Sequence, residues 1–464
     1  MSSKSKFQAI RGTRDLLPPE TALWNRVEQA AHEVFGTYGF GEIRVPIFEL
    51  KELFARSIGA DTDVVSKEMY TFDTNKQLLD DYLALSPQEQ AISALFDIPP
   101  SEASQFAAQR EKPKPIPEVV TLRPEATASV CRAYIEHNMQ QLPQPVKLYY
   151  MGPMFRRERP QKGRYRQFYQ IGAEILGGPD APAIDAELIE MLMTFFDKCG
   201  LQGTELSINS IGHAADNCRR GYVAKLKAEL EKVKDKLGAD SQRRIETNPL
   251  RVLDSKLEHE QPIIATLPHI ADHLCDECKT HYAAVKRDLD LRGVAYRENW
   301  RLVRGLDYYM RTTFEITAQG LGSQNAVCGG GRYDGLVELL GGPPTKGIGF
   351  AIGEDRLILS LQEGGKAPIA QGRDVFIAWM GQNAYATAIR AAKTLRNAGF
   401  RVELPATELK FGKALERASK LGSRFALILG EEEVSSGMWT VKRLADGTQT
   451  KMFGSAVVEF LKRG

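Results

Sequence analysis

Several familiar signatures of nucleotide and metal chemistry are absent from this sequence. There is no G-x-x-x-x-G-K-[ST] loop, and no G-x-G-x-x-G opens a helix after a strand, so neither of these phosphate-binding folds is predicted. There is no H-E-x-x-H motif, and C-x-x-C occurs only at Cys275 and Cys278. His273 and His281 lie close by in the sequence, but a second cysteine pair is missing. A zinc site is conceivable here, but we favour a surface helix and expect no metal site.

Cysteine is scarce, and long apolar runs are absent. The chain has six cysteines in 464 residues, a sparse usage that is typical of a reducing compartment. No apolar run approaches the roughly 18 residues that a membrane-spanning helix needs. The N-terminus has no basic region followed by an apolar one, as a secretory signal would. The sequence predicts a soluble, cytoplasmic protein with no membrane partner.

The overall charge is nearly balanced, with 61 basic and 59 acidic residues and a net charge of +2. This balance gives no sign that the whole surface binds a polyanion. The charge is unevenly distributed, however, because residues 373–464 carry 15 Lys and Arg against 9 Asp and Glu. That excess is a modest indication that the C-terminal part meets an anionic partner.

The order of patterns along the chain predicts more than one domain. Residues 1–212 and 291–361 mix helices and strands, and a capping box at 86–89 indicates an inserted helical hairpin at about 74–118. Residues 213–290 are mainly helical, with a strong helix from His213 to Leu237. The Gly-rich stretch 362–372 is the best boundary. Beyond it, residues 373–464 alternate strands and helices, which favours an α/β unit with a mostly parallel sheet.

Within the first region, hydrophobic spacing predicts individual elements. Helices are expected from Glu20 to about Tyr38, after Pro124, and at 184–199. A strand is expected at 42–49, where Pro46 indicates a sheet edge or an interface.

The most informative stretch is 147–176, which predicts an antiparallel hairpin with a polar loop. Because side chains alternate along a strand, Arg156 and Glu158 share one face of the first arm. Phe168, Gln170 and Glu174 share one face of the second. Such a face suits a charged, partly aromatic ligand better than a core. On charge alone, a solvated basic hairpin tip remains the alternative.

Five arginines lie beside aromatic or Gly-rich sequence in separate segments: Arg123, Arg156, Arg164, Arg304 and Arg356. A guanidinium group can bind phosphate with two parallel hydrogen bonds and stack on a purine. Taken singly, each of these arginines is better explained by a surface salt bridge. Together they suggest a phosphate-binding site that uses no conventional loop.

These motifs closely resemble those of the histidyl-tRNA synthetases, which are class II aminoacyl-tRNA synthetases. The class motif F-R-x-E matches Phe155–Glu158, and G-x-G-x-A-x-x-x-x-R matches Gly347–Arg356. Segments typical of the family are RGTRDLLP at 11–18, TLRPE at 121–125, RPQKGRYRQF at 159–168, LVRGLDYY at 302–309 and CGGGRYDGL at 328–336. The resemblance covers nearly the whole chain apart from 74–118.

The resemblance implies a role for each matching residue. Arg156 and Arg304 would be catalytic. Residues expected to bind histidine are Glu125, Thr127, Arg156, Gln170, Glu174, Arg304, Tyr308 and Tyr309. Residues expected to bind ATP are Arg156, Glu158, Arg164, Phe168 and Arg356. Arg159 and Gln161 would meet the acceptor end of the tRNA.

The resemblance also implies an α+β fold: a catalytic domain on an antiparallel sheet (1–212 and 291–361), a helical insertion (213–290) and an anticodon-binding α/β domain (373–464). The expected reaction joins L-histidine to tRNA(His) through a histidyl-adenylate, with ATP and Mg²⁺, in a homodimer. Two alternatives stay open. One is a non-catalytic paralogue that acts as regulatory subunit of ATP phosphoribosyltransferase, and the other is a histidine- or tRNA-sensing module.

The sequence departs from the family pattern at a few positions beside the matching residues. Arg157 and Tyr169 stand where the family often has His, and Ala126 stands where Gly is common. Met310 follows the tyrosine pair, and Glu354-Asp355 precedes Arg356 where Leu-Glu is common. These departures bear on fine tuning more than on activity.

Overall fold

The computed structural model describes residues 7–59, 62, 64–73, 119–304, 306, 308–319, 325–365 and 372–463. The chain divides into two compact units, residues 1–16 with 23–367 and residues 17–22 with 368–464. The predicted helical hairpin at 74–118 lies entirely outside the described residues. Within the described ranges, no helix has the length and apolar character needed to cross a membrane.

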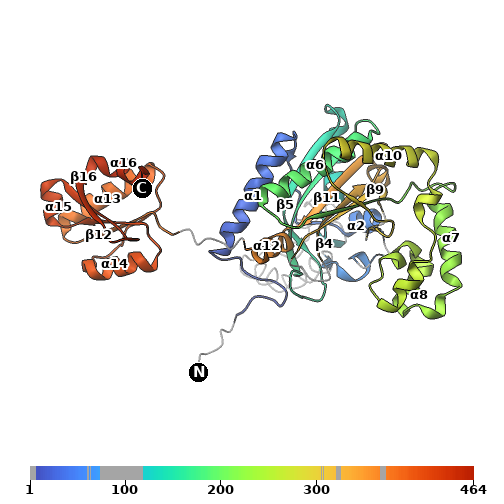
Figure 1. The fold of residues 1–464 in the computed structure, drawn as a ribbon, viewed down its shortest axis with the longest axis horizontal. Helices are drawn as coiled ribbons and strands as arrows, with labels where there is room; N and C mark the ends of the chain where they lie inside the picture. Colours follow the sequence, from blue (N-terminus) through green and yellow to red (C-terminus); the bar gives the residue numbers. More distant parts are fainter. Residues whose placement is uncertain are drawn as a thin grey trace, which may run out of the picture. The chain divides into compact units, whose positions relative to one another are not determined.

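The larger unit is built on an eight-stranded sheet in the order β1-β5-β6-β11-β10-β9-β7-β8 (Figure 1). Its strands are β1 (Gly41–Glu42), β5 (Val146–Phe155), β6 (Gln167–Leu176), β7 (Glu205–Ser210), β8 (Arg297–Glu298), β9 (Met310–Thr317), β10 (Ala326–Arg332) and β11 (Gly347–Gly353). The pairings from β5 to β7 are antiparallel, and only the edge strands β1 and β8 pair in parallel. The predicted α+β class with an antiparallel sheet is confirmed.

The predicted hairpin at 147–176 is present as β5 and β6. The two strands pair antiparallel from Val146 opposite Leu176 to Phe155 opposite Gln167. Strand β6 pairs on its other side with β11, from Gly347 opposite Leu176 to Gly353 opposite Gln170. The residues expected to carry chemistry therefore lie on a central strand and at the loop end of its hairpin.

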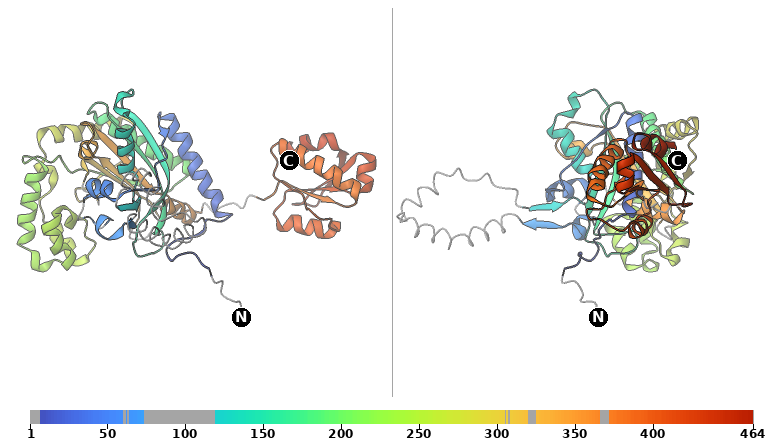
Figure 2. Two further views of the ribbon diagram at one scale, coloured as in Figure 1. Left: turned by 180° about the vertical axis from the view of Figure 1, so that it is seen from behind. Right: turned by 90° about the vertical axis from the view of Figure 1, so that its left-hand side faces the viewer.

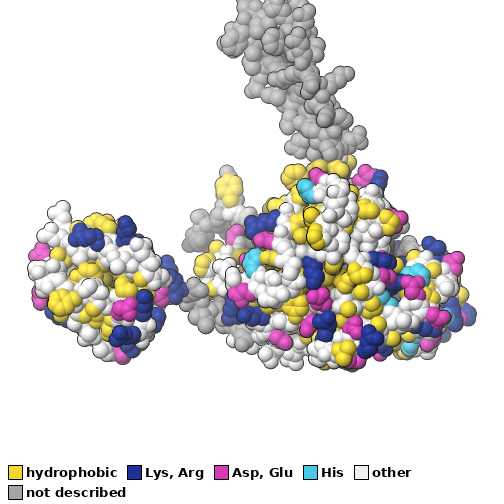
Figure 3. Space-filling model, turned by 90° about the horizontal axis from the view of Figure 1, so that it is seen from above, with side chains coloured by type: hydrophobic (Ala, Val, Ile, Leu, Met, Phe, Trp, Pro, Cys, Tyr) yellow, Lys and Arg dark blue, Asp and Glu magenta, His cyan; other side chains and the backbone are white. Residues whose placement is uncertain are grey.

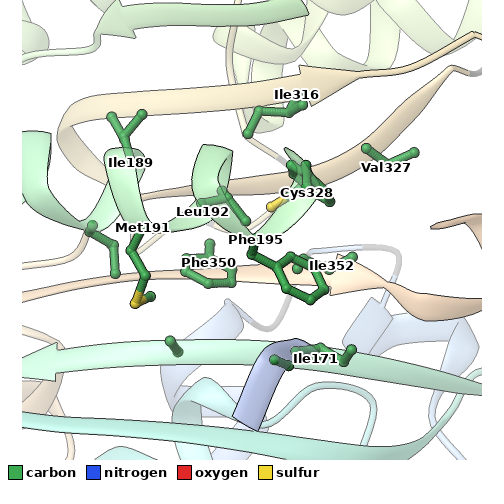
Figure 4. Packing of buried hydrophobic residues seen from close by; sticks show 14 of the residues in the cluster. Ile171, Ile189, Met191, Leu192, Phe195, Ile316, Val327, Cys328, Phe350 and Ile352 are labelled. Carbon is green, nitrogen blue, oxygen red and sulfur yellow. The ribbon is translucent and has the colours of Figure 1, made fainter. Parts of the chain in front are cut away.

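The two faces of the sheet bury different helices. Four helices pack on one face and share a hydrophobic core with it: α1 (Glu20–Thr37), α6 (Pro182–Cys199), α10 (Asp276–Leu291) and α12 (Glu354–Glu363). In Figure 4, side chains of α6 such as Leu192 and Phe195 lie against Phe350 and Ile352 of β11. A second core contains α5 (Thr127–Glu136) and α11 (Leu336–Leu339).

Alternation along β6 decides which side chains meet which core. Ile171, Ala173 and Ile175 belong to the core beneath α6, so Gln170 and Glu174 point to the opposite face. Both are buried there, with 8% and 0% of their surface exposed. The polar face predicted for the hairpin is thus turned toward α5.

The predicted strand at 42–49 is wrong, because the segment is split at Pro46. Residues before the proline join the large sheet as β1, and residues after it form β2 (Phe48–Leu50). Strand β2 belongs to a separate sheet with β4 (Val119–Leu122) and β3 (Thr71–Asp73), and Figure 2 shows β3 and β4 side by side. Proline has no N–H to donate to a ladder. The carbonyls of Val45 and Pro46 instead accept hydrogen bonds from Arg123 Nη1, at 2.6 and 3.2 Å.

The helical region after β7 has a core of its own. Its helices are α7 (Arg219–Glu231), α8 (Ala239–Thr247) and α9 (Gln261–Ile264), and Tyr222, Leu226 and Leu230 of α7 are fully buried. The helix predicted to begin at His213 begins at Arg219. Before it, the N–H groups of Cys218 and Arg219 close turns onto the carbonyls of Ala215 and His213.

Shorter helical segments complete the larger unit. They are α2 (Lys51–Ile58), a π-helix at Val64–Glu68, and 3-10 turns at Met139–Gln141, Lys234–Lys236, Pro249–Asp254, Glu258–Glu260 and Ile270–His273.

The smaller unit is a five-stranded sheet in the order β13-β12-β14-β15-β16. Its elements are β12 (Val375–Trp379), α13 (Gln382–Asn397), β13 (Val402–Glu403), α14 (Phe411–Lys420), β14 (Phe425–Leu429), α15 (Glu431–Ser436), β15 (Met438–Arg443), β16 (Gln449–Phe453), a 3-10 turn (Gly454–Ala456) and α16 (Val457–Arg463). Strands β13, β12 and β14 are parallel, whereas β15 and β16 add antiparallel pairs. The sheet is therefore mixed, because the hairpin β15–β16 extends the parallel part.

Charged side chains of both signs are interspersed on the face of the larger unit drawn in Figure 3. This pattern agrees with the nearly balanced composition.

A matched pair of leucines tests the core beneath α6. Leu192 of α6 is fully buried, whereas Leu291 at the end of α10 is 80% exposed. We expect Leu192→Ala to lower the free energy of unfolding by about 2–5 kcal/mol, since it removes buried apolar contacts and leaves a cavity. Leu291→Ala should change it by less than about 0.5 kcal/mol. Urea denaturation followed by circular dichroism measures both, and equal effects would contradict this packing.

Candidate active site

A cavity of about 1460 Å³ lies in the larger unit. Strands β6, β9, β10 and β11 contribute to its wall, together with the segments before α5 and after β5. It brings together most of the predicted site residues: Glu125, Thr127, Arg156, Glu158, Arg164, Phe168, Gln170, Arg304, Tyr308, Tyr309 and Arg356. Glu174, Arg159 and Gln161 are not part of its lining.

Glu174 lies directly behind the cavity wall, as a fully buried carboxyl group. Its Oε1 accepts a hydrogen bond from the Thr127 hydroxyl at 2.7 Å, and its Oε2 accepts one from the Tyr333 hydroxyl. Burial raises the pKa of Glu174 to about 8, although these two hydrogen bonds oppose the shift. A proton therefore stays on this carboxyl group near neutral pH.

Glu125 is also buried, and it ends the loop before α5. Its carboxylate accepts hydrogen bonds from the N–H groups of Thr127 and Ala128, at 2.7 and 3.1 Å. It thus satisfies two of the N–H groups that a helix leaves unpaired at its N-terminus. Burial raises the pKa of Glu125, while those N–H groups and the charge of Arg156 lower it.

Arg156 follows the last residue of β5 and is held in place from two sides. Its Nε donates to the carbonyl of Pro124 at 3.0 Å, and its guanidinium carbon lies 5.2 Å from the centre of the Phe168 ring. Its backbone N–H donates to the carbonyl of Arg166, which continues the hairpin pairing. The guanidinium group is therefore positioned before any ligand binds.

Two further arginines lie close together at another part of the cavity wall. Arg164 Nη1 lies 3.3 Å from Glu158 Oε2. Arg356 stands in the first turn of α12, and burial together with the charge of Arg164 lowers its pKa. Like charges that repel each other in a partly buried wall favour an anionic ligand.

Arg304 and the tyrosine pair form a third part of the wall. Arg304 Nη1 pairs with Glu315 Oε2 at 3.0 Å, and its guanidinium carbon lies 5.9 Å from the centre of the Tyr309 ring. The Tyr308 and Tyr309 rings are 4.6 Å apart. Burial raises the pKa of Tyr309, so its hydroxyl stays protonated.

Two polar atoms in this wall are buried without a hydrogen-bond partner among the residues that the structure describes. They are Nε of Arg304 and Oε1 of Gln170. An unpaired buried polar group costs free energy that a ligand can recover. These two atoms therefore indicate where polar groups of a ligand bind.

Three residues singled out in the sequence, Arg159, Gln161 and Arg123, do not line the cavity. Arg159 and Gln161 are exposed in the loop between β5 and β6, where Gln161 and Arg164 exchange backbone hydrogen bonds. The suggestion that Arg123 binds phosphate is wrong. Arg123 is buried, and its Nε donates to the carbonyl of Pro153 in addition to the bonds it makes to Val45 and Pro46.

Comparisons with known proteins agree with this geometry. Residues 112–357 match a family model described as histidyl-tRNA synthetase, and residues 374–464 match one described as an anticodon binding domain. A curated histidine–tRNA ligase from Koribacter versatilis is 49% identical over 460 residues, which are 98% of this chain and 96% of that protein.

The chain belongs to the histidyl-tRNA synthetase family.

Other members of the histidyl-tRNA synthetase family support this placement. The histidine–tRNA ligase of Solibacter usitatus is 49% identical over 447 residues, covering 96% of each chain. Among solved structures, the apo histidyl-tRNA synthetase of S. aureus matches with a TM-score of 0.74 and 35% identity. That match covers 98% of this chain and all of that one.

Sequence reasoning missed several residues that shape the site in this histidyl-tRNA synthetase family member. Tyr333, which donates to Glu174, lies in CGGGRYDGL but received no role. Asp355 accepts hydrogen bonds from Tyr169 N–H and Arg14, so RGTRDLLP is tied to the residue before Arg356. Further lining residues come from the helical region: Asp240, Arg243, Arg244, Arg251 and Lys256. None of the motifs identified in the sequence contains these charged residues.

The raised pKa of Glu174 predicts a pH dependence of stability. An unfolded Glu has a pKa near 4.5, so above that pH the unfolded chain gives up a proton that the folded chain keeps. The contribution of Glu174 to stability is then greatest below about pH 4.5 and falls as the pH rises toward 8. Glu174→Gln removes this titration. From about pH 5 to pH 8, the free energy of unfolding of wild type should fall by at least about 1 kcal/mol relative to that of Glu174→Gln.

Urea denaturation of both proteins across this pH range measures the difference. Glu338→Gln, at an exposed position of α11, is the control and should follow the wild-type curve. If the Glu174→Gln and wild-type curves stay parallel, the carboxyl group is not protonated in the folded protein.

Proposed function

We propose that this protein attaches histidine to tRNA(His) in two steps. In the first step, histidine and ATP form histidyl-adenylate and pyrophosphate. In the second step, the histidyl group passes to the terminal adenosine of the tRNA. The observation that carries this proposal is the cavity, which joins buried carboxyl groups and hydroxyls at one part of its wall to clustered arginines at another.

Histidine binding would use the buried polar groups around α5 and the tyrosine pair. Glu174 and Tyr309 would contact the two imidazole nitrogens, with Tyr308 beside them. Recognising an imidazole requires a donor and an acceptor, and a protonated carboxyl group offers both. A side chain that cannot pair with these buried groups is rejected strongly. Glu125, Thr127 and the unpaired Gln170 amide would receive the amino group.

ATP binding would use the arginines and the ring at the end of the hairpin. Phe168 would stack on the adenine, and Glu158 and Arg164 would hold the nucleotide, with Arg356 on its other side. Arg156 already lies over Phe168, so it would reach both the α-phosphate and the histidine carboxylate. The proximity of Arg164 and Arg356 supports this placement of the phosphates.

The chemistry of the first step requires positioning and charge stabilisation more than proton transfer. The histidine carboxylate is already ionised at neutral pH, so no general base is needed. Arg156 and Arg304 would stabilise charge that develops at the α-phosphate. Mg²⁺ neutralises phosphate charge when bound. The carboxylates of Glu158 and Glu315 in the cavity wall are the hard oxygen donors that it prefers, and they would hold it.

Transfer RNA would contact two parts of the chain. The exposed Arg159 and Gln161 in the hairpin loop would meet its acceptor end. Residues 374–464, which match the anticodon-binding family model and carry excess positive charge, would bind its anticodon region. The division into a catalytic core (1–212 and 291–361), a helical insertion (213–290) and an anticodon-binding domain (373–464) remains part of this proposal.

We further propose that the protein acts as a homodimer. Apolar side chains of the small sheet are exposed, namely Ile47, Phe48, Leu50 and Phe72. Leu50 of β2 and Phe72 of β3 both lie opposite Val120 of the central strand β4, so they share one face of this sheet. An exposed apolar face of this kind is typical of an interface.

The regulatory-subunit alternative is disfavoured by the composition of the cavity. A protein that only senses histidine needs the imidazole and amino-group contacts, but it has no use for three phosphate-directed arginines. Arg156, Arg164 and Arg356 all line the cavity here, and the C-terminal unit is present.

Charging of tRNA tests the proposed function. The full-length protein is incubated with ATP, Mg²⁺, labelled histidine and tRNA(His) transcript, and acid-insoluble label is counted. We expect label to accumulate only when ATP and tRNA(His) are both present. No incorporation by active, folded protein would refute the proposal.

Replacing Arg304 tests its role at the α-phosphate. Because Arg304 would stabilise transition-state charge, Arg304→Ala should reduce the rate of adenylate formation by roughly 10²-fold or more. Single-turnover formation of the adenylate measures this rate. Arg297→Ala is the control, since Arg297 lies on β8 with 71% of its side chain exposed. An unchanged rate in Arg304→Ala would remove this residue from the site.

A further inference from the structure

Four potential metal ligands meet outside the cavity. They are His213, Cys218, Cys275 and Cys278, and their ligand atoms all lie within 4.8 Å of one another. His213 Nδ1 is 3.1 Å from Cys278 Sγ and 3.7 Å from Cys275 Sγ. None of these residues lines the cavity described above. We propose that this tetrad binds one Zn²⁺ ion as a structural site.

Local backbone structure brings the four ligands together. His213 and Cys218 are the two ends of the turn that precedes α7. Cys275 precedes α10, and Cys278 lies in its first turn. Gly212 is required at this point, because a Cβ atom there would lie 2.6 Å from Cys218 Sγ, and its φ of +63° favours glycine.

The number, type and spacing of the ligands favour zinc. Three thiolates and one imidazole are a usual tetrahedral donor set for Zn²⁺, with Zn–S near 2.3 Å and Zn–N near 2.0 Å. Ligand atoms of such a tetrahedron lie roughly 3.5–3.8 Å apart. Cys275 and His213 already have this separation, and the full set needs only small side-chain movements. A cubane iron–sulfur cluster would need its cysteines farther apart.

All four positions are taken by protein side chains, which is typical of a structural site; a catalytic zinc keeps one position open. Cys218 and Cys278 are buried, and His213 and Cys275 are partly exposed, so an ion can enter.

The ligand set differs from the one that the sequence considered. His273 Nε2 lies 3.3 Å from Lys225 Nζ, and its ring lies against Tyr222. His281 Nε2 lies 3.8 Å from Asp185 and 3.9 Å from Asp180. Neither of these histidines belongs to the tetrad. His213 and Cys218, which are about 60 residues before the C-x-x-C pair, supply the missing ligands instead.

The site would hold the two ends of the helical region together and fix them to the catalytic sheet. His213 and Cys218 stand where the chain enters this region, and Cys275 and Cys278 stand where it leaves. Arg311 of β9 joins both ends, since its N–H donates to the Gly212 carbonyl and its guanidinium group pairs with Glu277.

The metal site would also influence the cavity indirectly. Arg219, the residue after Cys218, donates to the carbonyl of Tyr309. An ion bound at the tetrad would therefore steady the backbone of a residue that lines the cavity, which makes Cys218 a positioning residue.

Metal content of the untagged, full-length protein tests this proposal. The protein is reconstituted with Zn²⁺ in the presence of a thiol reductant, desalted and analysed by mass spectrometry for metals. Wild type should hold about one equivalent per chain, and Cys218→Ser or Cys275→Ser less than roughly a tenth of that. Cys199→Ser, at a buried cysteine of α6, is the matched control and should keep the full equivalent.

Two results would overturn the proposal. One is a wild-type protein that retains no zinc after reconstitution. The other is a Cys218→Ser variant that retains as much zinc as the Cys199→Ser control.

Cobalt substitution of wild type provides a test that does not depend on folded variants. Titration with Co²⁺ should produce thiolate-to-cobalt charge-transfer bands and the ligand-field bands of tetrahedral Co²⁺, saturating at about one equivalent. Spectra of octahedral Co²⁺ without thiolate bands would mean that the cysteines do not bind the ion.

Discussion

A single buried carboxyl group, that of Glu174, constrains much of the structure around the cavity. It lies inside the sheet with none of its surface exposed, where an ionised carboxylate would be costly. The buried position of this carboxyl group is stable for two reasons. Thr127 and Tyr333 donate hydrogen bonds to its two oxygens, and burial keeps it protonated. The adjacent strand must leave room for it, since any side chain at Gly349 would overlap Oε2.

This arrangement explains why three segments that are distant in sequence must meet. Helix α5 supplies Thr127, the segment after β10 supplies Tyr333, and β11 supplies the glycine. Each is positioned by another fixed group. Glu125 holds the first turn of α5 through two N–H groups, and the antiparallel register places Gly349 opposite Glu174. The polar wall is therefore preorganised, and Arg156 is fixed beside it by Pro124 and Phe168.

Sequence patterns could predict the helices and strands that depend on residues close together in the sequence. Alternation along 147–176 predicted the β5–β6 hairpin and the shared face of Phe168, Gln170 and Glu174, because strand periodicity needs no knowledge of the rest of the fold. Contacts between distant segments could not be derived in this way. The bond between Tyr333 and Glu174 joins residues 159 positions apart, and the metal tetrad joins His213 to Cys278 across 65 positions. The sequence suggested that Arg123 binds phosphate. Only the fold reveals that its N–H groups donate hydrogen bonds to backbone carbonyls.

The central claim is that the cavity activates histidine with ATP. The most direct measurement is ATP–pyrophosphate exchange by the full-length protein, without tRNA, for each of the common amino acids in turn. The account predicts exchange that depends on histidine and is at background level with the others, since the proposed contacts of Glu174 and Tyr309 would suit an imidazole and no other side chain. No exchange with histidine, or robust exchange with a different amino acid, would contradict it.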